Sequence, residues 1–237
     1  MNPYEKLINR KRKWTPVQTT AGTCKQGAEE AIHRALALRH MELPVGDFIT
    51  DALSSEVPSN ARELLYSNVL DEENHDVALG YIANAYGVDE KAEKEALRLK
   101  AAWEAHPDHT ITKALVAERA IFFVLLPFFR FNGDAGMRTV SADISRDEQI
   151  HVATNSLVHT ELGYNISPSL DKLRKATINW VMQPLGSHAD KYLDKKFWLD
   201  SSDRLMYEGK APQLAETKSA RMPAFFEHSN VNLPQYA

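Results

Sequence analysis

Two copies of the motif Asp-Glu-x-x-His constrain the fold of this chain more than any other feature of its sequence. One copy spans residues 71–75 and the other spans 147–151, so they lie 76 residues apart. A further glutamate precedes the glutamate of each motif by 30 residues, at Glu42 and at Glu118. Four positions therefore recur at one constant offset. This recurrence indicates a repeated unit of two helices, as in a four-helix bundle with two-fold pseudo-symmetry.

The motif has a chemical consequence when it is helical. Residues three apart share a helix face, so Glu-x-x-His directs a carboxylate and an imidazole at one point. Two such helices, with one glutamate from each of two more helices, form a carboxylate-bridged dimetal site. The sequence thus predicts six metal ligands: Glu42, Glu72, His75, Glu118, Glu148 and His151. Four carboxylates and two imidazoles suit iron or manganese better than copper or structural zinc. We therefore expect a dinuclear centre of iron or manganese that activates O2.

The surroundings of Glu118 support this interpretation. It lies in the apolar run 115–123, where an unpaired carboxylate would cost several kcal/mol. A buried basic partner is the alternative to a metal ion, and Arg119 points about 100° away around the helix. For the ligand at Glu42, the nearby acidic residues Glu29, Glu30 and Asp47 are alternatives.

A third Glu-x-x-His match, Glu30 with His33, has no counterpart 30 residues earlier, since that position falls off the chain. It is interpreted as a solvated pair. The repeat also predicts how the ligand histidines are held. A ligating histidine usually donates its second N–H to a carboxylate, and each aspartate points away from the histidine of its own motif. We expect Asp147 to bond His75 and Asp71 to bond His151.

Helix patterns dominate the chain, which is expected to be all-α. The predicted helices are Gln26–Phe48 (kinked at Pro44), Ser59–Gly87, Lys91–Ala105, Thr110–Phe131, one from about Asp134 to Gly163, Ser169–Leu185 and Ala189–Tyr207. Residues 1–208 are expected to form a single helical domain. Residues 209–237 are expected to be irregular and form a possible tail for docking a partner.

Composition narrows the function further. The charge balance of 28 basic against 32 acidic residues argues against a nucleic-acid binder. The only basic run, residues 10–13, is interpreted as a solvated face. Cys24 is the only cysteine, which excludes a disulfide scaffold and cysteine-based zinc sites. No signal peptide is visible, and the most apolar run, Ala120–Phe129, is too short to span a bilayer. We expect a cytoplasmic protein without a membrane or nucleic-acid partner.

Three segments, residues 4–14, 115–123 and 145–151, resemble the small, radical-generating subunit of class I ribonucleotide reductase. The resemblance implies a ferritin-like bundle with additional helices, usually a homodimer, and the same six ligands. It also implies a catalytic large subunit as partner and a role in deoxyribonucleotide synthesis. In that family a tryptophan bonds an aspartate that contacts a metal-bound histidine. Here Trp14, Asp147 and His75 match those positions, a route for an electron to the metals.

Two positions depart from the family. Its radical tyrosine usually lies four residues after the first ligand histidine, where this chain has Leu79, and Tyr81 lies on another face. Leucine cannot hold an oxidising equivalent, so we expect the metal pair itself to store it. The resemblance implies a Mn/Fe or Fe/Fe pair, and Mn/Fe is the first choice because family members that lack the tyrosine use it. The second departure is the tail after Phe226, which has only eleven residues. In the family this tail carries a redox tyrosine and docks on the catalytic subunit. Tyr236 is the only tyrosine in it and is expected to relay the electron, the alternative being an unremarkable terminal residue.

Two other functions stay open. A stand-alone dimetal oxidase or acyl desaturase would show a long apolar tunnel and need no partner protein. Iron storage fits less well, because the chain has helices after residue 165 and a tryptophan relay at Trp14. The sequence leaves open which metals bind and whether the substrates of the enzyme are ribonucleoside diphosphates or triphosphates.

Overall fold

The computed structural model describes residues 2–55 and 57–214, and every regular element within these two stretches is helical. The α-helices are α1 (Pro3–Ile8), α2 (Glu29–Ala37), α3 (Glu42–Leu53), α4 (Arg62–Tyr86), α5 (Glu90–Glu104), α6 (Thr110–Ala117), α7 (Phe123–Asn132), α8 (Ala135–Glu161), α9 (Pro168–Met182) and α10 (Lys195–Glu208). Short 3-10 turns cover Leu38–Met41, Ser59–Ala61, Gln183–Leu185 and Pro212–Leu214, and a π-helical turn, Glu118–Phe122, joins α6 to α7.

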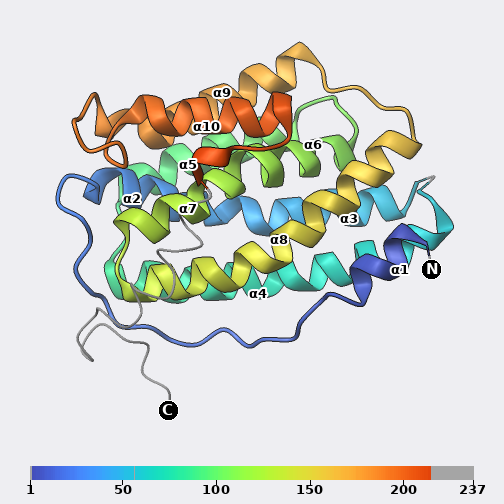
Figure 1. Ribbon diagram of the computed structural model, residues 1–237, viewed down its shortest axis with the longest axis horizontal. Coiled ribbons are helices and arrows are strands. Elements are labelled where there is room, and N and C mark those ends of the chain that lie inside the picture. Colours follow the sequence, from blue (N-terminus) through green and yellow to red (C-terminus); the bar gives the residue numbers. More distant parts are fainter. Residues whose placement is uncertain (1, 56, 215–237) are drawn as a thin grey trace.

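Four helical rods form the centre of the molecule. The long helices α4 and α8 pack against each other, α3 packs on α4 and α6, and the continuous rod of α6 and α7 packs on α8 (Figure 1). Helices α9 and α10 lie together on the far side of α6 and α7 from α4 (Figure 1). Each rod of the centre therefore has one face toward the other three, which is where buried side chains gather.

The segment between α1 and α2 has no helix and runs along the outer edge of α4 and α8 (Figure 1). Backbone and side-chain hydrogen bonds attach its far end to the turn before α8, since Gly22 N–H donates to Asp134 and Lys25 N–H donates to the carbonyl of Asn132. This extended segment consequently covers the pair of helices that carry the two Asp-Glu-x-x-His motifs.

Helix starts follow local capping chemistry. Asp89, Asp134, Ser167 and Asp194 each precede a helix, and each side chain accepts a backbone N–H from the first turn. These bonds satisfy donors that have no partner within the helix. The end of α4 is set by Gly87, whose φ of 96° is a conformation that other residues rarely adopt.

The first predicted long helix is wrong in its interior and at both ends. A 3-10 turn, Leu38–Met41, separates α2 from α3, and Pro44 is the third residue of α3. Proline lacks an N–H, and only the first-turn N–H groups of a helix have no intrahelical partner. Pro44 therefore marks the start of α3, which continues to Leu53, instead of a kink within one helix.

Other boundaries also differ from the prediction. His109, not Thr110, caps α6 through its Nδ1 atom, and residues 189–194 form turns, so α10 begins only after Asp194. The short helix α1 was not predicted. Within the tail, the structure describes residues 209–214, and Tyr236 lies outside the described residues.

Candidate metal centre

The four central rods bring all six predicted ligands into one buried cluster. Glu42 is the first residue of α3, and Glu118 is the first residue of the π-helical turn. Helix α4 contributes Glu72 and His75, and helix α8 contributes Glu148 and His151. None of the six side chains belongs to a residue more than 3% exposed. Burial of four carboxylates at one place demands a compensating positive charge.

The six residues form two overlapping groups. In one, ligand atoms of Glu42, Glu72, His75 and Glu148 all lie within 4.8 Å of one another. In the other, ligand atoms of Glu72, Glu118 and His151 satisfy the same limit. We call these the His75 position and the His151 position.

Two carboxylates lie between the histidines. Glu72 Oε2 is 3.4 Å from His75 Nδ1, and Glu72 Oε1 is 2.9 Å from His151 Nδ1. Glu148 Oε1 lies 3.4 Å from His75 Nδ1 and 3.9 Å from His151 Nδ1. Glu72 and Glu148 therefore lie between the two positions, while Glu42 approaches only His75, at 3.7 Å, and Glu118 approaches only His151, at 3.6 Å.

Several polar atoms of the cluster are buried without a well-formed hydrogen bond. They are Nδ1 of His75 and of His151, both oxygens of Glu72 and of Glu148, Glu42 Oε2 and Glu118 Oε1. An unsatisfied buried polar atom costs about 1–3 kcal/mol. A cluster with this many unsatisfied atoms is therefore unstable without a bound cation or bound protons. Two divalent cations would satisfy these atoms, and the donor set fits ions that prefer oxygen and imidazole ligands. The cluster can hold metal.

Without metal, the cluster is expected to hold protons. Burial raises the pKa of Glu118 to about 8 and also raises the pKa values of Glu42 and Glu148. Burial lowers the pKa of each histidine, but the surrounding carboxylates outweigh it and raise both pKa values well above the usual range. The pKa of Glu72 shifts in the opposite direction, because the two nearby histidines outweigh its burial and lower it. Metal ions must displace these protons.

The predicted crossed pairing of histidines and aspartates is confirmed. His75 Nε2 lies 3.3 Å from Asp147 Oδ2 on α8, and His151 Nε2 lies 2.9 Å from Asp71 Oδ2 on α4. Since a carboxylate accepts, each Nε2–H donates outward. This bond leaves Nδ1 facing the cluster, and loss of the Nδ1 proton gives the lone pair that can bind a metal.

The two aspartates have different outer partners, both from the segment between α1 and α2. Trp14 Nε1 donates to Asp147 Oδ2 at 2.6 Å, and the Trp14 ring lies 6.2 Å from the His75 ring at an angle of 24°. Asp71 instead forms an ion pair with Lys11. The contact of Trp14 matches the expected electron route. Lys11 was missed, because the basic run was interpreted as solvated, whereas its side chain is only 10% exposed.

The glutamate of the π-helical turn is held by a residue that the sequence analysis also missed. Asn155 Nδ2, one turn beyond His151 on α8, donates to Glu118 Oε2 at 2.6 Å. A π-helical turn widens the helix and is frequent at functional sites. Here it places the Glu118 carboxylate in the cluster while the rod of α6 and α7 continues.

The remaining candidate residues lie away from the cluster. Glu30 is mostly exposed and pairs with Arg34 at 2.7 Å, so the third Glu-x-x-His match is not part of the centre. Leu79 is buried one turn after His75, and Tyr81 is half-buried on a different face of α4. The position at which the resemblance implies a radical tyrosine therefore holds a buried leucine.

Within residues 2–55 and 57–214, no helix combines the length and the apolar character needed to cross a membrane. The chain matches no protein-family model and no curated protein sequence.

Proposed function

We propose that this chain is the dimetal subunit of a ribonucleotide reductase, with a ferritin-like bundle around a dinuclear Mn/Fe or Fe/Fe centre. The observation that carries the proposal is the contact series from Trp14 through Asp147 to His75. A buried acidic cluster alone suits several dimetal proteins. Trp14 is partly exposed and is linked to His75 through Asp147. Such a link is what an enzyme needs if it moves electrons between its metal centre and a partner protein.

The metal pair, when bound, would react with O2 and supply one oxidising equivalent for the reaction on the partner. The residues of the chain have separate tasks in this scheme. Glu72 and Glu148 lie between the two positions and would hold both ions. Asp147 orients His75 and accepts the N–H of Trp14, which keeps the indole in contact with the ligand. Trp14 passes an electron inward, and the partner replaces it from a cysteine.

Storage of the oxidising equivalent then falls to the centre itself. Leu79 is buried on α4, four residues after His75, and has no redox chemistry at physiological potentials. We propose a mixed Mn/Fe pair as the store, a homodimer as the assembly, and a separate catalytic subunit as the partner whose cysteine is oxidised.

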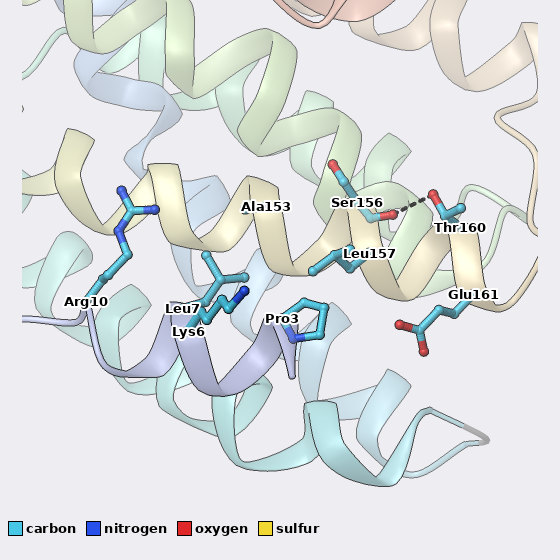
Figure 2. A pocket seen from close by; sticks show the side chains of 9 residues that line it. All are labelled: Pro3, Lys6, Leu7, Arg10, Ala153, Ser156, Leu157, Thr160 and Glu161. Atoms are coloured by element: carbon cyan, nitrogen blue, oxygen red, sulfur yellow. Dashed lines mark hydrogen bonds between the residues drawn. The ribbon is translucent and has the colours of Figure 1, made fainter. Parts of the chain in front are cut away.

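The alternative enzyme, an acyl desaturase or stand-alone oxidase, needs an apolar tunnel that reaches the metals. The structure has an apolar groove of about 580 Å³ between α1 and α8, shown in Figure 2. It is open to the surface, and its lining includes Leu7 and Leu157 but none of the six ligands. This groove therefore does not lead a substrate chain to the centre. Iron storage is not favoured either, because a Trp14 relay has no use there.

The test compares metal content, EPR spectrum and reductase activity of the O2-treated protein with a candidate catalytic subunit. Trp14→Phe removes the indole N–H, so we expect normal metal content with loss of reductase activity. Trp180→Phe is the matched control, since its Nε1 donates to Glu95, outside the cluster. Full activity of Trp14→Phe, or activity without a partner, would refute the proposal.

A further inference from the structure

The two halves of the centre are related by the sequence repeat, but they are not equal in charge. Ligand atoms of Glu42, Glu72 and Glu148 gather around His75 within 4.8 Å, whereas those of Glu72 and Glu118 gather around His151. Glu148 lies between the histidines but nearer to His75, since its Oε1 is 3.4 Å from His75 Nδ1 and 3.9 Å from His151 Nδ1. The groups that bind the two aspartates also differ in charge. Asp147 accepts a neutral indole N–H, while Asp71 is paired with the full positive charge of an ammonium group.

Lys11 is held firmly in its place. Its Nζ forms the ion pair with Asp71 and also donates to Asn68 Oδ1 at 2.9 Å, and Asn68 is fully buried on α4. Little water surrounds these groups, since the side chains of Lys11 and Asp71 are 10% and 12% exposed. Charge–charge interactions at such partly buried sites are screened much less than at the surface.

The charge of Lys11 reaches the second metal position through two contacts. Lys11 neutralises Asp71, and Asp71 Oδ2 is the acceptor for His151 Nε2–H at 2.9 Å. A carboxylate bound to an ammonium group withdraws less proton density from the imidazole than a carboxylate bound to a neutral donor. His151 would thus be a weaker electron donor to a metal than His75, and the Lys11 charge would also repel a cation at this position.

We propose that Lys11 is a positioning residue that makes the two metal positions unequal, so that the His75 position binds a divalent cation first and more tightly. The inference rests on the proposed dimetal function and extends it to the order of metal loading. An ordered loading is what a mixed pair of metals requires, since two equal positions would fill with either metal. The contacts that lead outward from His151 end at Lys11, and an ammonium group cannot be oxidised. Trp14 is therefore the electron route.

The test uses metal-free full-length protein and Mn(II) alone. Competition with a chromophoric chelator measures the two affinities, and anomalous scattering from crystals loaded with one equivalent identifies which position fills. We expect the wild type to fill the His75 position first. Lys11→Met keeps the length of the side chain without its charge, so it should tighten the His151 position by about tenfold and leave the His75 position nearly unchanged.

Two variants serve as controls. Lys13→Met makes the same change in net charge at an exposed lysine of the same segment, and it should alter neither affinity. Lys11→Arg keeps the charge and should behave as the wild type, which guards against a loss of folding in Lys11→Met. Thermal melts of the metal-free proteins check that all variants fold.

The outcomes separate this inference from the function on which it rests. Equal filling of both positions in the wild type, an equal change at both in Lys11→Met, or a weakened His151 position would refute the role of Lys11 and leave the dimetal centre standing. A wild-type protein that binds no divalent metal would refute both.

Discussion

Replacement of Glu118 by glutamine should change the stability of the protein in opposite directions with and without metal. Glutamine has the shape of the carboxylic acid, and its carbonyl can still accept the Asn155 N–H that Glu118 Oε2 accepts at 2.6 Å. It cannot ionise. The substitution therefore isolates the electrostatic cost of a carboxylate at this buried place from its packing and hydrogen bonding.

The magnitude follows from the pKa of the carboxyl group. Burial raises the pKa of Glu118 from 4.5 to about 8 in the metal-free protein. A raised carboxyl pKa stabilises the protonated folded state at low pH, and this contribution is lost as pH rises from the unfolded value through the folded one. Linkage over the interval from about pH 6.5 to about pH 8.5 gives a loss of about 2 kcal/mol in the free energy of unfolding. Glu118→Gln should not show this loss.

Chemical denaturation at both pH values, with and without Mn(II), measures the effect. Without metal, the wild type should lose about 2 kcal/mol more than Glu118→Gln as pH rises. With Mn(II) bound, the wild type should be more stable than Glu118→Gln, because the variant lacks one metal ligand. Glu30→Gln, at an exposed carboxylate paired with Arg34, is the control and should follow the wild type. A variant that is less stable by one constant amount in all four conditions would refute the reasoning, since Glu118 would then be a structural residue.

Three further predictions concern the other residues of the centre. Asp71→Asn and Asp147→Asn should each weaken divalent metal binding by about 10–100-fold, and an unchanged affinity in a chelator competition would contradict the crossed pairing. Glu42→Ala should reduce the metal content below that of the wild type while circular dichroism shows intact helices, and full metal content with full activity would exclude Glu42 as a ligand. Tyr81→Phe should leave the EPR spectrum of the O2-treated protein unchanged, because the side chain lies half-buried on another face of α4; a tyrosyl signal that disappears in this variant would place the radical there.

Much of the centre could be predicted because it depends on local helix geometry. The spacing of Glu72 from His75 and of Glu148 from His151 places each pair on one helix face wherever the helix lies. The repeat then identifies the two remaining glutamates, and the structure places all six together. The all-helical class and most helix ends follow from similar local signals, such as Asp89 and Asp134 as caps.

Other parts of the site depend on contacts between segments that are distant in the chain. Lys11 and Trp14 lie in a segment without helix periodicity, and no local rule shows which aspartate each of them meets. Asn155 is one more polar residue of α8 until the π-helical turn brings Glu118 to it. The break between α2 and α3 could not be predicted from local signals either, because Pro44 is compatible with a kink or with a helix start.

The sequence by itself determined which side chains share a helix face, and hence the six residues of the centre and the crossed aspartate–histidine pairs. Periodicity is a property of one helix and survives any arrangement of its neighbours. The tertiary structure decided what stands behind each aspartate, an indole on one side and an ammonium group on the other. That choice depends on the path of an extended segment across α4 and α8, and an extended segment has no internal repeat from which its partners can be read.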